Sequence, residues 1–192
     1  KGYTGKNARE GNAVQTLETE RLILRDWTED DAKDVYRYAV DPEVGPRAGW
    51  KPHESLAESR AVIRLFRAED NVWAIERKSD RRVIGSLGLH ADKWRNLPDA
   101  RMLGYVLAQD CWGSGYMSEA VRCVIEYGFL DAGMALLSVS HYTFNDRSRR
   151  VIEKCGFTCE GTIRRAFRRY DGAVFDETIY SLTREEWEAR QT

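Results

Sequence analysis

The sequence of 192 residues lacks the features that mark several large classes of protein. No apolar run approaches the roughly 18 residues that a transmembrane helix requires, so no membrane partner is expected. The N-terminal stretch KGYTGKNAREGNAVQ is polar and does not resemble a signal peptide as it stands. Charge of one sign does not dominate either, because 30 Lys and Arg residues face 31 Asp and Glu residues. This balance argues against a protein that coats nucleic acid and against an acidic disordered tail.

Cysteine and histidine are scarce and dispersed. The three histidines are scattered, and the four cysteines, Cys111, Cys123, Cys155 and Cys159, contain no C-x-x-C pair. This pattern fits neither a disulfide-rich secreted domain nor a zinc site. We therefore expect a reduced, cytoplasmic protein without a metal.

The chain has enough apolar material for one core, since 42% of its residues are hydrophobic and 11% are aromatic. Its length is typical of a single domain. No repeat, low-complexity segment or linker interrupts it. Residues 1–16 are expected to form a flexible N-terminal arm, and residues 17–192 one folded domain.

Hydrophobic periodicity predicts strands that alternate with helices. Strands are expected near 20–27, 72–76, 83–89, 102–107, 136–142, 158–169 and 174–182, and a hairpin turn at Asp171-Gly172. Helices are expected near 28–40 and 54–68, between the turn at 112–116 and Gly133, at 145–155, and briefly after Thr183. A polar Pro/Gly loop should join the first two helices. The order β-α-α-β-β-β-α-β-α-β-β predicts a single mixed α/β domain.

The most informative segment is the Gly-rich turn Trp112-Gly113-Ser114-Gly115-Tyr116, between a strand and a long amphipathic helix. The N–H groups and the dipole at such a helix start favour a phosphate or pyrophosphate. A P-loop is excluded because Gly-Lys-Ser/Thr is absent. A Rossmann turn is excluded because Ser118 occupies the third glycine position. By itself the turn is equally compatible with an ordinary strand–helix junction.

Five blocks in order resemble the GNAT superfamily of acetyl-CoA-dependent N-acetyltransferases, and within it the RimJ/RimL-like ribosomal-protein N-acetyltransferase branch. They are the opening LETERLILR (17–25), the hairpin WAIE…VIG (73–85), GYVL with WGSGYMSEA (104–120), Asn145 and Ser148 with EKCGF (153–157), and the closing hairpin up to YSL (180–182). The resemblance covers residues 19–187. It implies a GNAT-like domain with a mixed, mostly antiparallel central sheet flanked by helices.

The resemblance also implies roles for particular residues. Residues expected to bind acetyl-CoA are Val106, Leu107, Trp112, Gly113, Ser114, Gly115, Tyr116, Met117 and Asn145. The amides of 113–117 would hold the pyrophosphate, residues 106 and 107 would pair with the pantetheine arm, and Asn145 would hydrogen-bond it. Ser148 would lie near the thioester sulfur. Two positions depart from the family pattern. Asp110 opens the Gly-rich signature, and Met102 stands where many relatives carry a carboxylate.

The missing carboxylate leaves the general base open. His90, at the end of a strand near the expected acceptor cleft, is the first candidate, against the alternative of a partly exposed loop histidine. His141 is expected to be a satisfied core or cleft-wall residue. Glu160 and Asp176 are further candidates, although both fit ordinary strand or hairpin positions. Glu119, just inside a helix, is expected to complement the helix dipole rather than to take part in catalysis.

We therefore expect an enzyme that transfers an acetyl group directly from acetyl-CoA to a primary amine, either a protein N-terminus or a small molecule. Trp50, in the Pro/Gly loop, is a candidate wall of the acceptor pocket, whereas Trp27, Trp94 and Trp187 are expected mainly in the core or cleft wall. One alternative is an acyl-CoA-binding module with little turnover. Another is a ribosome- or nucleic-acid-binding protein that uses the basic cluster at 147–169, although such a cluster is usually a solvated face. A monomer and a homodimer are both compatible with the sequence.

Overall fold

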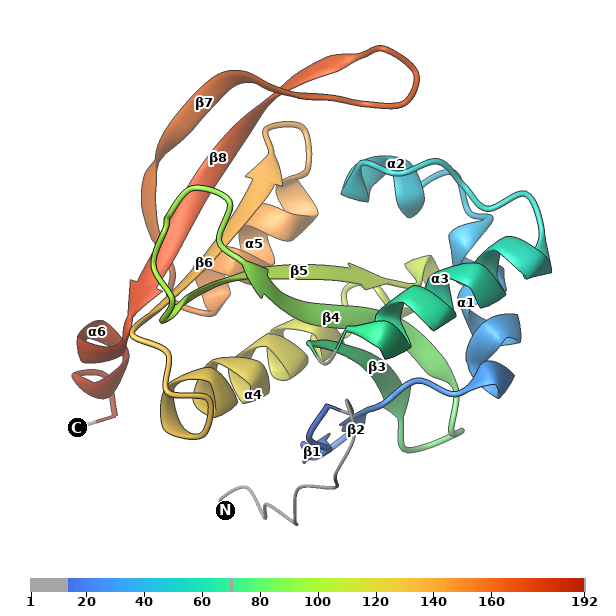
Figure 1. Cartoon of the computed structure of the whole chain (residues 1–192), viewed down its shortest axis with the longest axis horizontal. Coiled ribbons are helices and arrows are strands. Elements are labelled where there is room, and N and C mark those ends of the chain that lie inside the picture. Colours follow the sequence, from blue (N-terminus) through green and yellow to red (C-terminus); the bar gives the residue numbers. More distant parts are fainter. Residues whose placement is uncertain (1–13, 70, 192) are drawn as a thin grey trace. The chain divides into compact units, whose positions relative to one another are not determined.

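The structure is a computed structural model, which describes residues 14–69 and 71–191 (Figure 1). The strands are β1 (Leu17–Glu18), β2 (Leu22–Arg25), β3 (Val72–Arg77), β4 (Val83–Ala91), β5 (Ala100–Leu107), β6 (Leu136–Tyr142), β7 (Thr158–Arg168) and β8 (Val174–Thr183). The α-helices are α1 (Ala32–Ala39), α2 (Gly45–Ala48), α3 (Leu56–Ala68), α4 (Tyr116–Leu130), α5 (Asp146–Lys154) and α6 (Arg184–Glu188). Two 3₁₀ turns, η1 (Glu29–Asp31) and η2 (Gln109–Cys111), complete the order.

Eight strands form one sheet in the order β1-β2-β3-β4-β5-β6-β8-β7. The pairs β1–β2, β2–β3, β3–β4, β6–β8 and β7–β8 are antiparallel, and β5–β6 is parallel. The expectation of a mixed, mostly antiparallel sheet in an α/β fold is therefore confirmed. Among the residues described, no helix has the length and apolar character needed to cross a bilayer.

The parallel ladder between β5 and β6 is short. It runs from Ala100↔Leu136 to Leu103↔Val139 and ends there. Strand β5 continues beyond it through Gly104–Leu107. Strand β6 continues as the antiparallel partner of β8, for example at Ser140↔Ile179. A strand that leaves its ladder presents peptide groups that a ligand can engage.

The chain forms two compact units, the first from residues up to 88 with 105–123, and the second from 89–104 with 124–192. In the first unit the aromatic core residues Trp27 and Trp73 are almost completely buried. In the second unit Phe129 and Leu137 have no exposed surface. Burial of such side chains contributes about 1.5–3 kcal/mol each. Cys111, Cys123, Cys155 and Cys159 are free thiols.

The N-terminal region is described only from Val14 onward, so residues 1–13 of the expected arm lie outside the described part of the chain. Val14 is buried. The carbonyl oxygen of Gln15 accepts a hydrogen bond of 2.8 Å from the Trp73 indole N–H. A two-residue strand, β1, then precedes β2 and pairs with it. The strand expected at 20–27 is therefore the shorter β2, with β1 in addition.

The loop expected between the first two helices contains the short helix α2, so the prediction of an unbroken loop there is wrong. Its proline, Pro46, lies in the first turn, where the missing N–H costs nothing. Gly49 closes α2 with a φ of 95°. A Cβ on Gly45 would lie 2.6 Å from the Trp50 ring, so glycine is what allows that ring to pack there. Proline and glycine indicate a loop in sequence, but here they begin and end a helix.

Candidate functional site

The Gly-rich turn joins β5 and η2 to the N-terminus of α4. Gly113 and Gly115 have φ values of 79° and 82°, a conformation that side chains with a Cβ rarely adopt. No atom lies within 4 Å of the position that a Cβ on Gly113 would occupy. The first-turn N–H groups of a helix have no intrahelical acceptor and attract an anion. The turn therefore has the open space and polarity that a pyrophosphate needs.

Two arginines stand beside this turn. The Arg21 Nη1 donates to the Ser114 carbonyl oxygen at 3.0 Å, and its guanidinium carbon lies 4.4 Å from the Tyr116 ring centroid. The Arg77 guanidinium lies 5.9 Å from the same ring. Stacking on an aromatic ring holds an arginine in place while leaving it charged. Both arginines are ion-paired, Arg21 with Glu119 at 2.6 Å and Arg77 with Asp80 at 2.5 Å, so neither brings an uncompensated charge to the turn.

Glu119 holds one of these arginines and has a structural role. Its carboxylate lies 2.6 Å from Arg21 Nη2 and accepts hydrogen bonds from the Thr19 hydroxyl at 2.6 Å and the Arg21 backbone N–H at 2.9 Å. Burial alone would raise the pKa of Glu119, but the hydrogen bonds from Thr19 and Arg21 outweigh it, so the pKa is lowered. The carboxylate is thus committed to an ion pair in the first turn of α4, where a negative charge also complements the dipole.

The end of β5 is held close to both β4 and the turn. The Trp112 indole N–H donates to the Leu107 carbonyl oxygen at 2.9 Å. A Cβ on Gly85 would lie 2.2 Å from the Val106 carbonyl oxygen, so only glycine allows β4 and β5 to approach so closely there. The first unit therefore contains most of the residues predicted to bind acetyl-CoA, namely Val106, Leu107, Trp112, Gly113, Ser114, Gly115, Tyr116 and Met117.

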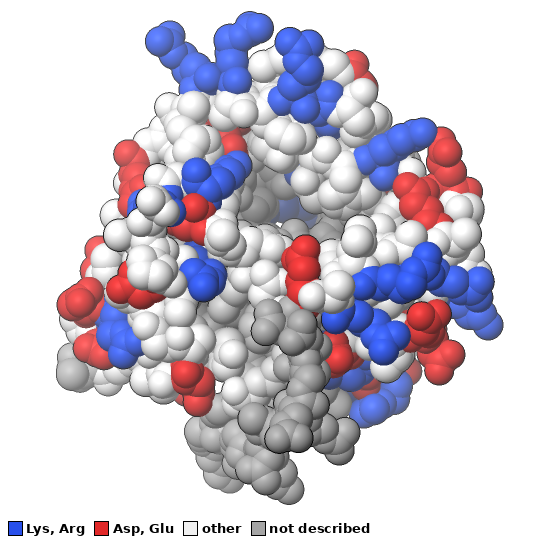
Figure 2. Space-filling model, viewed as in Figure 1, with Lys and Arg blue, Asp and Glu red and all other residues white. Residues whose placement is uncertain are grey.

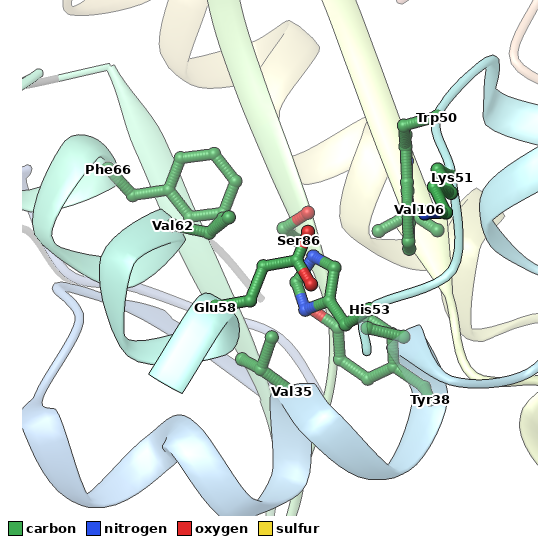
Figure 3. Close-up of a pocket in the computed structure, with 11 residues that line it drawn as sticks. Val35, Tyr38, Trp50, Lys51, His53, Glu58, Val62, Phe66, Ser86 and Val106 are labelled. Atoms are coloured by element: carbon green, nitrogen blue, oxygen red, sulfur yellow. The ribbon is translucent and has the colours of Figure 1, made fainter. Parts of the chain in front are cut away.

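The same unit contains a cavity of about 310 Å³ (Figure 3). Its walls are Val35, Tyr38 and Ala39 of α1, Trp50, Lys51 and His53 of the segment after α2, Glu58, Val62 and Phe66 of α3, Ser86 of β4 and Val106 of β5. This size lies at the lower end of the range for small-molecule sites. Trp50 thus lines a cavity, and Val106 links that cavity to the end of β5.

Polar groups enter this largely apolar cavity at few points. In Figure 3 the side chains of His53 and Glu58 lie between the rings of Phe66 and Trp50. The Trp50 and His53 ring centroids are 5.4 Å apart. Tyr38 is buried, which raises the pKa of its hydroxyl, and the charges of Asp31 and Asp34 raise it further. The Tyr38 hydroxyl therefore remains protonated over the physiological range.

The second unit holds Asn145, Ser148 and His90. Asn145 is the N-cap of α5, and its side-chain oxygen accepts a hydrogen bond of 3.3 Å from the Ser148 backbone N–H. Asn145, rather than Ser148, thus provides the helix cap in this turn. The expected helix start at residue 145 is confirmed.

His90 lies in β4, half-buried, with its Cδ2 and Nε2 atoms 3.4 Å from the position of a Cβ on Gly104. It is not among the residues that line the cavity described above. The expected role of His141 is confirmed, because this buried side chain interacts with the Tyr142 carbonyl oxygen at 2.9 Å and the Tyr180 hydroxyl at 3.3 Å. His141 is thus a satisfied core residue.

The carboxylates proposed as further bases have structural partners. Glu160 pairs with Arg95 and accepts a hydrogen bond of 2.6 Å from the Ser181 hydroxyl. Asp176 accepts one of 2.7 Å from the Arg165 backbone N–H. Both therefore fit the ordinary strand and hairpin roles that the sequence also allowed. Trp94 is 38% exposed, with Lys93 Nζ 4.8 Å from its ring centroid, so of the two expected positions, core or cleft wall, it does not occupy the core.

The basic cluster at 147–169 is partly neutralised within the second unit. Arg149 pairs with Asp146 and Glu153, each at 3.1 Å. Arg169 pairs with Asp171 at 2.6 Å. In Figure 2 positive side chains project near the tip of the β7–β8 hairpin, while acidic and basic residues mix over much of the visible face. This mixture fits a solvated surface.

The sequence did not point to Tyr38, His53 or Glu58 as site residues. His53 and Glu58 follow the Pro/Gly segment without any motif, and Tyr38 belongs to the apolar stripe of α1. The only signal was Trp50, a large aromatic residue in a loop three positions before His53. A large aromatic side chain in a loop is expected to pack against other residues, and here the Trp50 ring forms part of the cavity wall.

The fold and the site define an α/β protein with an anion-attracting turn next to an apolar cavity. The model of the acetyltransferase (GNAT) domain family matches residues 21–158. The chain therefore belongs to the GNAT family and is an N-acetyltransferase, as its resemblance implied.

Similar proteins agree with this assignment. The chain is 31% identical over 175 residues to the uncharacterized N-acetyltransferase YoaA of Bacillus subtilis (strain 168), covering 88% of this chain and 96% of that protein. The ribosomal-protein-S5-alanine acetyltransferase of Vibrio fischeri has a similar fold, with a TM-score of 0.69 at 21% identity over 90% of this chain and 98% of that one. So does the microcin C7 self-immunity acetyltransferase MccE, solved with acetyl-CoA and AMP, with a TM-score of 0.72 at 20% identity over 86% and 93% of the two chains.

Proposed function

We propose that this enzyme transfers the acetyl group of acetyl-CoA directly to a primary amine bound in the cavity of the first unit. The observation that carries the proposal is the position of Val106. This residue belongs to the end of β5, where the thioester arm is expected, and it also forms part of the cavity wall. One strand end therefore serves both ligands, as direct transfer requires.

The residues of the chain fit acetyl-CoA. The amides of 113–117 would hold the pyrophosphate, because both glycines have positive φ, the Cβ position of Gly113 faces open space, and that of Gly115 lies 3.5 Å from Arg21 Nη2. The peptide groups of Val106 and Leu107 would engage the pantetheine arm. The microcin acetyltransferase of similar fold is solved with acetyl-CoA, which supports this choice of cosubstrate. When bound, acetyl-CoA supplies the acetyl group as a thioester.

The cavity favours a primary amine that carries an apolar group. Val35, Val62 and Phe66 give it apolar walls, and its volume of about 310 Å³ suits a compact group such as one side chain or a small aromatic ring. The Glu58 carboxylate and the Trp50 ring would both attract an ammonium ion. A small amine and the first residue of a protein both have this form.

The test is an acetyl-transfer assay with acetyl-CoA and a panel of amines, read by mass spectrometry. The panel holds phenethylamine, spermidine, leucine amide, and tripeptides that begin with alanine or leucine. We expect transfer to the apolar primary amines. Binding of acetyl-CoA without transfer to any amine would instead indicate an acyl-CoA-binding module. Binding to RNA that weakens steeply with salt would indicate a nucleic-acid-binding role.

A matched pair of tryptophan variants tests the position of the acceptor. Trp50→Ala should raise KM for the amine about 10-fold and leave the affinity for acetyl-CoA unchanged, because the ring is a cavity wall. Trp94→Ala removes an equal side chain that does not line the cavity, and should change neither constant. Equal effects of the two variants would place the acceptor elsewhere.

A further inference from the structure

We propose that His53 is the catalytic residue that accepts the proton of the acceptor amine during acetyl transfer. The inference rests on the proposed function of the cavity and goes beyond it by assigning the base. The sequence nominated His90 for this role, and His90→Gln is the competing test. His53 is favoured because its side chain lines the cavity that also reaches Val106.

The position of His53 is fixed at two points. Its backbone N–H donates to the Ala39 carbonyl oxygen at the end of α1, at 2.9 Å. Its Nδ1 lies 2.8 Å from the Ser59 hydroxyl oxygen on α3, and Ser59 is completely buried. A ring held between two helices in this way loses little freedom when a substrate binds.

The second nitrogen of the ring is available for chemistry. Among the residues that the structure describes, none hydrogen-bonds to His53 Nε2, whereas Nδ1 is engaged by Ser59. A neutral imidazole that donates its Nδ1 proton to Ser59 presents a lone pair on Nε2. Ser59 thus acts as a positioning residue that holds the ring through Nδ1 and leaves Nε2 facing no protein partner in the described part of the chain.

The other ionisable groups around His53 are unsuited to this role. Tyr38 on α1 stays protonated because its pKa is raised. Lys51, which also lines the cavity, forms an ion pair with Glu54, just before α3. Glu58 on α3 accepts the Glu54 backbone N–H at 2.8 Å, and its negative charge is better suited to attract an ammonium ion.

The electrostatic surroundings keep the ring neutral. Burial lowers the pKa of His53 from its ordinary value near 6.5, and the charge of Glu58 offsets part of that change. At neutral pH the imidazole is therefore in the form that accepts a proton. A basic site near neutrality is what a general base requires.

The step balances without any other reactant. The neutral amine nitrogen attacks the thioester carbonyl, a C–N bond forms and the C–S bond breaks. As the nitrogen becomes cationic its protons become acidic, so even a base weaker than the free amine can accept one. His53 Nε2 takes that proton and releases it to solvent, and the thiolate takes up one proton from solvent, so that the products are the amide, the free thiol and a neutral imidazole.

The first experiment compares pH profiles of kcat/KM for the best amine of the panel. With two groups that must be unprotonated, the amine and His53, log kcat/KM falls with a slope of about 2 below the His53 pKa. His53→Asn keeps an amide near the Nδ1 position but cannot titrate. It should lower kcat/KM by about 100-fold at neutral pH and reduce that slope to about 1. A role confined to folding would leave the slope unchanged.

A second experiment needs neither acetyl-CoA nor an amine. An NMR titration of the histidines in the ligand-free protein should show one imidazole with a pKa below 6.5 that disappears in His53→Asn. Glu58→Gln removes a charge that raises the His53 pKa, so it should move that titration further down. A His53 signal at or above the ordinary value, or no response to Glu58→Gln, would overturn the inference.

The two proposals fail in distinguishable ways. If the wild-type enzyme acetylates no amine of the panel, the proposed function fails. If transfer is intact in His53→Asn with an unchanged slope, only the assignment of the base fails. If His90→Gln reduces the slope of log kcat/KM against pH to about 1 while His53→Asn leaves it at about 2, the base is His90.

Discussion

Two strand-to-helix junctions in this chain look alike in topology and differ in how the helix begins. Before α5, Asn145 uses its own side chain to accept a hydrogen bond from the Ser148 N–H. Before α4, the residue in the corresponding place is Gly115, which has no side chain to offer. The first junction caps an N–H group of its helix with a side chain, while the second has no side chain at that position and is the one proposed to bind the pyrophosphate. The contrast separates a junction with a side-chain cap from one without.

The largest effect is expected from a substitution in the junction before α4. Gly115→Val forces a β-branched residue to a φ of 82°, which costs ~1–2 kcal/mol, and displaces the amides from the pyrophosphate. We expect the affinity for acetyl-CoA, measured by calorimetry, to fall by about 100-fold, or ~2.7 kcal/mol.

Gly133→Val is the matched control for this change. Gly133 has a similar φ of 70° and open space around it, but it follows the other end of α4. It should lower stability to a similar extent and leave the affinity for acetyl-CoA unaltered. Equal affinities in the two variants would show that the turn does not bind the cosubstrate.

A smaller effect is expected at the junction before α5, where Ser148 would assist departure of the CoA thiolate. Ser148→Ala should lower kcat by about 10-fold, because a thiol of pKa near 8.5 is already a fair leaving group and needs modest help. The melting temperature should change little, since the cap is provided by Asn145. A lowered melting temperature with wild-type kcat on the folded fraction would assign Ser148 a structural role only.

The smallest effect removes the cap itself. Asn145→Ala should destabilise the protein by about 1 kcal/mol, measured by urea unfolding, because the Ser148 N–H loses its acceptor. Asn145→Ser retains an acceptor at that position and should recover most of this loss. If serine recovers none of it, the side-chain hydrogen bond does not stabilise α5.

The fold was largely predictable because its signals are local. The apolar, strand-forming run over 83–89, the Asp171-Gly172 turn and the Asn145 cap each specify structure within a few residues, and all three occur where expected. The helix α2 was missed because proline and glycine indicate a loop, and η1 was merged with α1. The glycine turn was also recognisable, since its conformation depends on residues that adopt positive φ.

The acceptor cavity was much less predictable. Its walls come from α1, the segment after α2, α3, β4 and β5, which are brought together only by the tertiary fold. His53 becomes a candidate because Ser59 and Ala39 hold it in place, and neither contact has a sequence motif. His90 was the sequence candidate because it ends a strand near the expected acceptor cleft, and it does not line the observed cavity.

The position of Val106 in the cavity wall has a consequence for the kinetic mechanism, that is, for whether both substrates must be bound before any product leaves. The cavity walls include no cysteine, and their only serine, Ser86, is hydrogen-bonded to the Tyr38 hydroxyl. The direct transfer proposed above requires donor and acceptor to occupy the enzyme together, so double-reciprocal plots at several amine concentrations should intersect rather than run parallel.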